Sequence, residues 1–163
     1  MKPTVYFATD HAGFALKQGL LSFVRDELGY VVIDVGAHEF NEFDDYPDFV
    51  ALAAAKVSEH PTDRAIILGA SGQGEAMVAN RFPNVRAAVF YGSPQVLQTD
   101  ASGNSLDLIV SSRLHNDANV LSLGARFITD EVAKQAVTTW LSSNFSADER
   151  HVRRIKKIEQ LVR

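Results

Sequence analysis

Three short segments of the sequence carry residue types that could support acid–base or anion-binding chemistry. Residues 10–13 read Asp-His-Ala-Gly, residues 69–75 read Gly-Ala-Ser-Gly-Gln-Gly-Glu, and residues 124–126 read Gly-Ala-Arg. A carboxylate or an imidazole can transfer a proton, an arginine can bind an anion, and glycine lets the backbone approach a ligand closely. Each segment follows an apolar run, so all three fall at the ends of predicted strands.

The glycine-rich segment is a candidate cradle for an oxyanion or a phosphate. It precedes a predicted helix, whose first N–H groups favour an anion, and Glu75 would lie in the first turn of that helix. A carboxylate beside N–H donors can remove a proton α to a carbonyl while the developing enediolate oxygen is held. Two simpler interpretations stay open, namely a tight turn without a ligand and a helix-start charge stabilised by the helix dipole. The segment has neither the ending of a nucleotide P-loop nor the spacing of a dinucleotide fingerprint.

Asp10 and His11 are either a helix cap followed by a solvated histidine or two groups that face the same crevice. In a crevice the imidazole would hold a phosphate or a sugar oxygen, and the aspartate would accept hydrogen bonds from hydroxyl groups. We expect no metal site, because the five histidines are scattered and no pair has ligand spacing with a carboxylate.

Two further sets of polar residues lie outside these strand ends. Residues 115–119, His-Asn-Asp-Ala-Asn, precede a predicted strand, and a strand of about five residues spans roughly 17 Å. They are therefore either a helix-and-turn feature or groups that act on a partner's site, which would make a dimer necessary. Arg150 and Arg154 are four residues apart on the last predicted helix. Charged side chains on a terminal helix usually face the solvent and have no further role. Together with Arg126, however, these two arginines could form a three-guanidinium pocket for a phosphate dianion.

The elements that would position these residues alternate along the chain. Continuous apolar strands separated by helices predict a parallel sheet covered on both faces, a five-stranded α/β sandwich whose ligand crevice lies beyond the carboxyl ends of the strands. Residues 91–110 would hold a long surface loop. Strands are predicted over residues 5–8, 31–35, 65–68, 85–90 and 120–123, and helices over residues 16–28, 45–57, 75–80, 93–97 and 129–141.

A separate basic helix is predicted over about 146–162, where Ser146 and Glu149 have capping-box spacing. It would pack either on its own domain or on a neighbouring subunit. The length of 163 residues, without repeats or a linker, suits one domain, residues 1–163.

Composition excludes several classes of function. The net charge of -4, from 16 basic and 20 acidic residues, predicts no nucleic-acid or membrane partner. The absence of cysteine excludes disulfides, thiolate metal sites and cysteine nucleophiles. No signal-type or membrane-spanning apolar stretch is present, so we expect a cytoplasmic protein.

The order of the motifs resembles the ribose-5-phosphate isomerase B family, which includes the galactose-6-phosphate isomerase subunits. The motifs are residues 10–14 with 16–17, residues 45–48, the glycine loop with residues 79–80, residues 86–88 and residues 115–121. The resemblance implies a Rossmann-like three-layer α/β/α fold and a homodimer or dimer of dimers with shared active sites. It also implies isomerisation of a sugar phosphate such as ribose 5-phosphate through a cis-enediol, with no metal or other cofactor.

The resemblance also assigns roles to particular residues. Glu75 would be the proton-transferring base and His115 the acid that opens the sugar ring. Many members place a catalytic cysteine where this chain has Gly69, and a second branch, to which this sequence is similar, uses a glutamate at the end of the loop. Contacts with the sugar phosphate would come from Asp10, His11, Ala70, Ser71, Gly72, Gln73, Gly74, Asn116, Arg126, Arg150 and Arg154.

The stretch between Arg86 and His115 is longer than family members usually have, which bears on the pocket rim and on substrate preference. Three alternatives therefore stay open. They are an isomerase of another aldose phosphate, of the galactose 6-phosphate or allose 6-phosphate type, a non-catalytic sugar-phosphate-binding module, and an inactive subunit that needs a paralogous partner.

Overall fold

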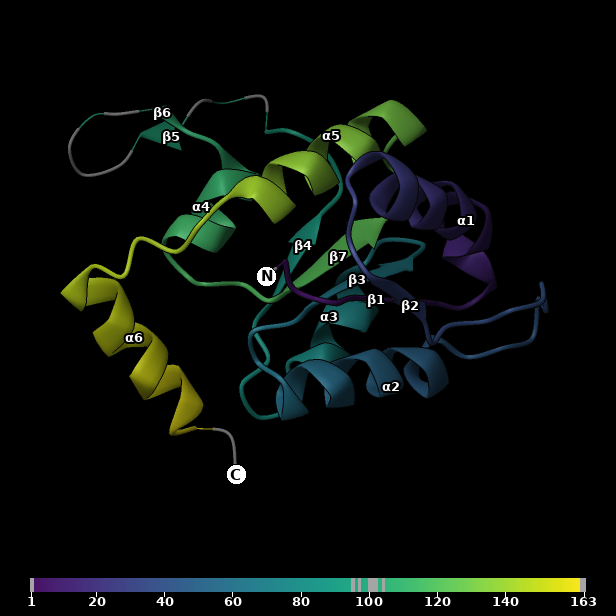
Figure 1. Ribbon diagram of the computed structural model, residues 1–163, viewed down its shortest axis with the longest axis horizontal. Helices are drawn as coiled ribbons and strands as arrows, with labels where there is room; N and C mark the ends of the chain where they lie inside the picture. Colours follow the sequence, from purple (N-terminus) through teal and green to yellow (C-terminus); the bar gives the residue numbers. More distant parts are fainter. Residues whose placement is uncertain (1, 95, 97, 100–102, 104, 162–163) are drawn as a thin grey trace.

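A computed structural model describes residues 2–94, 96, 98–99, 103 and 105–161, which form a three-layer α/β/α sandwich (Figure 1). The central sheet has five parallel strands in the order β2-β1-β3-β7-β4, which confirms the predicted fold class. The elements are β1 Val5–Thr9, a 3-10 turn His11–Gly13, α1 Phe14–Ser22, a π-helical turn Phe23–Glu27, β2 Val32–Asp34, α2 Tyr46–Glu59, β3 Arg64–Gly69, α3 Gln73–Ala79, β4 Ala87–Phe90, β5 Gln98–Thr99, β6 Ser105–Leu106, α4 Leu108–Leu114, β7 Val120–Gly124, α5 Asp130–Ser142 and α6 Glu149–Glu159.

The three central strands are buried on both faces, which explains why their sequences are continuously apolar rather than alternating. On one face, α1 and α5 cover the sheet, and Trp140 of α5 is fully buried there. On the other face, α2 and α3 pack through small residues and valines such as Ala53, Val57 and Ala79. Burial of both faces holds the carboxyl ends of the strands in fixed positions along one edge of the sheet.

The predicted helix signals agree with the structure at most boundaries. The first helix continues from α1 through the π-helical turn and is followed by Gly29, whose φ of +66° suits a residue without a Cβ. Thr129 caps α5 by accepting a hydrogen bond from the N–H of Val132. None of the described helices is long and apolar enough to cross a membrane.

The segment after β4 differs from the prediction. Ser93 and Pro94 are exposed and not helical, while Gln95 and Leu97 of the predicted helix lie outside the described residues. A predicted helix of only five residues is too short to form without packing against other elements. In place of a long loop the structure has the antiparallel pair β5–β6 and then α4. The sequence pattern missed α4 because its apolar residues are adjacent rather than helically spaced, although Asp107 caps it through the N–H of Val110.

The last helix, α6, lies outside both helical layers (Figure 1). The predicted capping box is wrong, because the helix begins at Glu149 after Asp148, and Ser146 instead accepts a hydrogen bond from the N–H of Asp148. Val162 of the predicted helix lies outside the described residues. Near its other end, Glu159 binds the guanidinium group of Arg86 at 2.7 Å, which ties α6 to its own domain.

Candidate active site

A pocket of about 380 Å³ opens at the carboxyl ends of β1, β3 and β7. These strands are neighbours in the sheet, so the three segments that follow them emerge side by side. The structure thereby brings together predicted residues from all three segments. The lining residues are Asp10, His11, Ala12, Tyr46, Ala70, Ser71, Gly74, Glu75 and Arg126.

The glycine loop between β3 and α3 is held against the end of β7. The buried hydroxyl of Ser122 donates a 2.6 Å hydrogen bond to the carbonyl of Gly72, and the N–H of Arg126 donates to the carbonyl of Ala70. Gly72 has a φ of +75°, and a Cβ there would lie 3.0 Å from the backbone of Leu123. Glycine is therefore required at this position both for the backbone conformation and for the close approach of the two segments.

Glu75 turns back from the first turn of α3, and its side chain covers Gly69. Only 4% of the residue is exposed, and its carboxylate occupies the space that a Cβ at position 69 would need. Burial raises the pKa of Glu75 above its ordinary value. The nearby charge of Asp10 adds to this increase, and a hydrogen bond from the backbone N–H of Glu75 opposes it. A carboxylate with a raised pKa at a pocket is suited to proton transfer near neutral pH.

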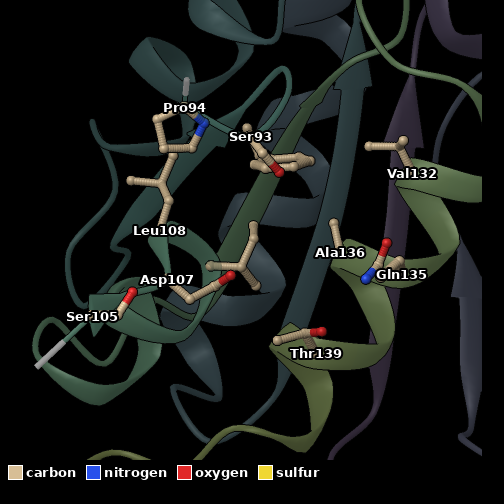
Figure 2. Close-up of a pocket in the computed structure, with 11 residues that line it drawn as sticks. Ser93, Pro94, Ser105, Asp107, Leu108, Val132, Gln135, Ala136 and Thr139 are labelled. Atoms are coloured by element: carbon tan, nitrogen blue, oxygen red, sulfur yellow. The ribbon is translucent and has the colours of Figure 1, made fainter. Parts of the chain in front are cut away.

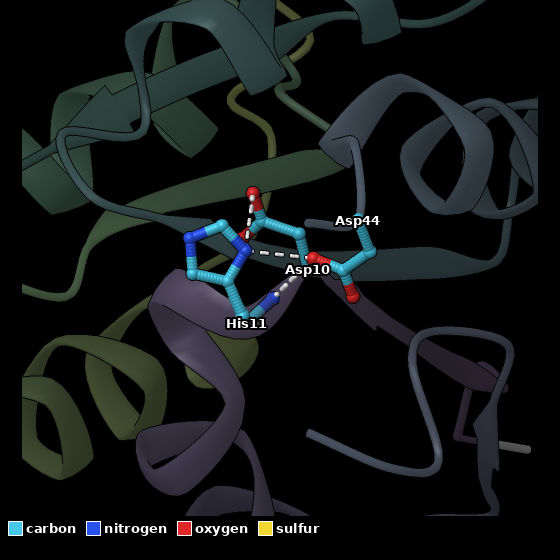
Figure 3. Close-up of side chains that lie close together, drawn as sticks. All are labelled: Asp10, His11 and Asp44. Atoms are coloured by element: carbon cyan, nitrogen blue, oxygen red, sulfur yellow. Dashed lines mark hydrogen bonds and ion pairs between the residues drawn. The ribbon is translucent and has the colours of Figure 1, made fainter. Parts of the chain in front are cut away.

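Asp10 and His11 follow β1, and a third residue, Asp44, completes a cluster in which His11 is hydrogen-bonded to Asp44 and lies at ion-pair distance from Asp10 (Figure 3). Asp44 Oδ1 lies 2.7 Å from His11 Nδ1 and also accepts a 3.0 Å hydrogen bond from the backbone N–H of His11. Asp10 accepts a hydrogen bond from the N–H of Ala12. The hydrogen bond to Asp44 raises the pKa of His11, against the opposing effects of partial burial and of the positive charge of Arg126.

These three side chains also have the residue types of a metal site. One potential ligand atom from each lies within 4.8 Å of the others. However, His11 Nδ1 and Asp44 Oδ1 are already joined by a short hydrogen bond, and Asp10 Oδ1 is bound to the backbone N–H of Ala12. We therefore interpret the cluster as a hydrogen-bonded network around the imidazole ring.

The remaining predicted side chains do not line this pocket. Gly72 and Gln73 belong to the loop without lining it, whereas His115 and Asn116 follow α4 on the amino-end side of β7. His115 packs against the buried His151 of α6, with ring centroids 4.5 Å apart and the rings tilted by 42°. Burial lowers the pKa of His151. Nearby His115, Arg150 and Arg154 add to this effect, and Asp148 opposes it. His115, Arg150 and Arg154 therefore form a separate cluster around His151.

The three-guanidinium pocket considered from the sequence is not formed within one chain. Arg126 lies at the carboxyl end of β7, whereas Arg150 and Arg154 are exposed on α6. Helix α6 is anchored near the amino ends of the strands, away from Arg126. Glu159 of α6 binds the N–H of Asn84 and the guanidinium group of Arg86, and both residues lie just before β4.

Another cavity, of about 310 Å³, lies away from these groups between α4, α5 and the segment after β4 (Figure 2). Among the described residues of its lining, Asp107 is the only acidic group, and its carboxylate already caps α4. This described part of the lining thus lacks the convergent acid, imidazole and guanidinium groups of the strand-end pocket.

Sequence reasoning missed Ala12, Tyr46 and Asp44 as site residues. Tyr46 belongs to residues 45–48, a motif that carries the family resemblance and begins a predicted helix but to which no site role is assigned. In the structure its hydroxyl packs against Gly74. Asp44 directly precedes the same motif. Nothing in the sequence around Asp44 indicates that its side chain contacts His11. Both positions depend on how residues 35–45 cross the end of the sheet.

Comparison with known proteins gives consistent relatives over nearly the whole chain. The family model described as Ribose/Galactose Isomerase matches residues 5–158. Ribose-5-phosphate isomerase B from Mycolicibacterium paratuberculosis is 33% identical over 159 residues, covering 98% of this chain and 91% of the relative. The Escherichia coli protein of the same name is 33% identical over 154 residues, covering 94% and 93%.

Solved structures agree with the fold. The crystal structure of ribose-5-phosphate isomerase B from Mycoplasma genitalium with bound ribulose-5-phosphate has a TM-score of 0.83 and 33% identity, covering 99% of this chain and 97% of that chain. The Clostridium thermocellum ribose-5-phosphate isomerase B structure has a TM-score of 0.81 and 36% identity, covering 97% and 96%.

The fold and the pocket define an α/β protein with a buried acid beside a glycine loop at the carboxyl edge of a parallel sheet. The matches to the family model and to known relatives then identify the family within this class of protein. The chain belongs to the Ribose/Galactose Isomerase family.

Proposed function

We propose that this protein is an aldose–ketose isomerase that interconverts ribose 5-phosphate and ribulose 5-phosphate. The names of its relatives and the ribulose-5-phosphate bound to the Mycoplasma genitalium protein support this substrate. The observation that carries the proposal is the buried carboxylate of Glu75, which lies over Gly69 beside the glycine loop. Aldose–ketose isomerisation needs one group that moves a proton between adjacent carbons, and Glu75 supplies it.

In this mechanism Glu75 removes the proton from C2 of the open-chain aldose and returns it to C1, while the hydroxyl proton of O2 passes to O1. The raised pKa of Glu75 lets the side chain both accept and release that proton near neutral pH. The oxygen that becomes negative in the cis-enediol is held by backbone N–H groups of residues 70–74. Such donors act most strongly on the charge that develops in the transition state.

The phosphate would be bound at the other end of the pocket by Arg126 and His11, which both line it. His115, Asn116, Arg150 and Arg154 would reach the pocket of a second copy of the chain in a homodimer, where His115 opens the sugar ring. The separate cluster of His115 with the α6 arginines supports this arrangement, because it gathers these groups away from their own pocket.

Exposed apolar side chains at the β4 edge of the sheet support association with a second copy. The edge strand β4 and helix α3 line a groove that includes Met77 and Tyr91, which are 69% and 51% exposed. Large apolar side chains gathered at an exposed sheet edge favour association with another chain.

Glu75→Gln should lower kcat for ribose 5-phosphate by several orders of magnitude while changing KM little, because the base acts mainly in the transition state. The measurement is turnover of the purified chain, combined with incorporation of deuterium from solvent at C2 of ribose 5-phosphate formed from ribulose 5-phosphate. A binding module would incorporate no deuterium. Near-normal turnover of the variant would remove Glu75 from the mechanism.

Comparison of kcat/KM among five- and six-carbon aldose phosphates tests the substrate, since we expect the stretch between Arg86 and His115 to be longer than in most family members and to shape the pocket rim. A preference for a six-carbon sugar would overturn ribose 5-phosphate as the substrate while keeping the reaction type. Activity of the single purified chain would exclude a need for a paralogous partner.

A further inference from the structure

Asp44 contacts His11 through one carboxylate oxygen that serves two donors. Both the backbone N–H and the Nδ1 of His11 lie within hydrogen-bond distance of Asp44 Oδ1, at 3.0 and 2.7 Å. The Asp44 side chain is only 9% exposed. A shielded carboxylate that meets the ring and the backbone of one residue fixes both the χ angles and the position of that residue.

We propose that Asp44 is a positioning residue of this active site, which orients the His11 ring by accepting a hydrogen bond from Nδ1 and favours the doubly protonated ring, whose Nε2 then donates to the phosphate of the substrate. The proposal rests on the isomerase function proposed above. It assigns to Asp44, a residue outside the glycine loop and the strand ends, the task of preparing His11 for an anion.

The position of the first ring proton follows from the geometry. An ionised carboxylate has no hydrogen to donate, so at 2.7 Å from Asp44 Oδ1 the His11 Nδ1 must carry the proton. Nε2 then lies on the side of the ring that is turned away from Asp44 (Figure 3). A neutral ring would present only a lone pair there, whereas a protonated ring presents an N–H donor.

The surrounding charges favour the protonated ring. Asp10 and Asp44 both raise the pKa of His11, and Arg126, which faces it from the segment after β7, acts in the opposite direction. The hydrogen bond that Asp44 accepts from the His11 ring has the largest single effect. His11 is therefore charged over a wider pH range than a free histidine and can assist Arg126 in binding a phosphate.

The second oxygen of Asp44 shows that this carboxylate is not placed for stability alone. Asp44 Oδ2 is buried and has no hydrogen-bond partner among the described residues. A buried carboxylate oxygen without a donor lowers the stability of the fold. The imidazolium of His11 is then the main group that compensates the Asp44 charge, which ties the two residues together electrostatically.

The segment that carries Asp44 is itself held in place. Fully buried Lys17 binds Asp34 at 2.7 Å and the carbonyl of Ala37 at 2.6 Å, so residues 34–37 are fixed to α1. Farther along the segment, the rings of Phe40 and His11 are nearly perpendicular, with their centroids 6.2 Å apart. His11 is thus enclosed by Phe40 on one side and Asp44 on another before any substrate binds.

The first experiment measures the pKa of His11 by NMR, without substrate, in the wild type and in Asp44→Asn. The His11→Asn variant identifies the His11 signal among the five histidines. We expect Asp44→Asn to lower the pKa of His11, because the amide cannot stabilise the positive ring. The control Glu42→Gln, which removes a charge from an exposed position in the same segment, should leave the pKa of His11 nearly unchanged.

The second experiment follows KM for ribose 5-phosphate against pH. For Asp44→Asn we expect KM to rise by about tenfold at pH values where only the wild-type ring is charged, since a charge-assisted hydrogen bond contributes about that factor. The difference should shrink at low pH, where both rings are protonated, and kcat should change much less than KM. In a His11→Asn background, Asp44→Asn should have little further effect on KM.

An unchanged pKa of His11 in folded Asp44→Asn would overturn the proposal. A loss of kcat/KM that is equal at every pH, or that persists in the His11→Asn background, would also overturn it, because it would indicate a purely structural role. If the wild type lacks isomerase activity, the proposed function fails, while the NMR titration still decides whether Asp44 controls His11.

Discussion

Glu75 and Asp10 are two carboxylates of one pocket whose surroundings differ. Asp10 accepts a hydrogen bond from Ala12 and lies 4.0 Å from the ring nitrogen of His11, so its negative charge is compensated. Glu75 is buried over Gly69 and its pKa is raised. Carboxylates held in such different environments can divide binding and proton transfer between them. The geometry supports Asp10 in binding and Glu75 in proton transfer.

Gly69→Ala should lower kcat by about 100-fold, because the added methyl group would displace the Glu75 carboxylate, and a shift of about 1 Å at a reacting group can cost that factor. Steady-state kinetics with ribose 5-phosphate would measure the effect. Gly19→Ala is the control, since that glycine is exposed in α1 with nothing within 4 Å of a Cβ. A wild-type kcat for Gly69→Ala would show that the carboxylate acts from another position.

Glu75→Gln should raise Tm at pH 8 and leave it nearly unchanged below the ordinary pKa of 4.5. Because the folded-state pKa is raised, the folded protein holds a proton that the unfolded chain releases, and stability falls as pH rises through that interval. The uncharged amide of the variant does not suffer this loss of stability. Thermal unfolding of the wild type and the variant at both pH values measures the difference in Tm.

The control for this unfolding experiment is Glu131→Gln. Glu131 has a lowered pKa because it accepts hydrogen bonds at the start of α5, so the substitution should lower Tm at pH 8 instead. Equal changes for both variants would contradict the assigned environments.

Part of the site could be predicted from single residues. Asp10, the glycine loop and Arg126 each follow an apolar strand, and parallel strands carry their ends to one edge, so the sequence was sufficient to group them. Tyr46 lines the pocket and Asp44 contacts His11, and both belong to a segment whose path depends on contacts such as that of Lys17 with Asp34. No periodicity or strand-end position indicates such a path.

At the level of elements, the glycine loop depends on a side chain of a different strand. Ser122 of β7 is fully buried and holds the carbonyl of Gly72. Ser122→Ala should lower the free energy of unfolding by about 1 kcal/mol, the usual contribution of such a hydrogen bond, and lower kcat because the loop amides lose their fixed position. Denaturant unfolding and turnover measure the two effects; unchanged kcat with reduced stability would show that the loop is held by its other contacts.

The strands of the central sheet could be predicted from the sequence, whereas several short elements could not. The strands of the sheet are continuously apolar because both faces are covered, and that pattern is visible in the sequence. The β5–β6 pair and α4 were missed because they are short and partly exposed, and their positions depend on local turns and on packing against α5. The start of α6 was also misplaced, since Ser146 binds His151 and Asp148 rather than capping the helix.

At the level of the whole molecule, the predicted site residues form two clusters at opposite ends of the sheet. If the clusters meet across a dimer interface, mixing Glu75→Gln with His115→Ala should restore part of the activity, because a heterodimer contains one site with both native residues. Turnover is measured after subunit exchange has been confirmed by mass spectrometry. No recovery after exchange would place both residues in one subunit or remove one of them from the reaction.

The carboxylate that lies over Gly69 also determines which inhibitors this protein can bind covalently. Many members of the family are expected to carry a catalytic cysteine at the position of Gly69, whereas this chain contains no cysteine. Peroxide and thiol-directed electrophiles therefore have no target in the pocket, and oxidative stress leaves the proton-transferring group intact. Compounds selective for this branch must instead imitate the charge and shape of the enediolate.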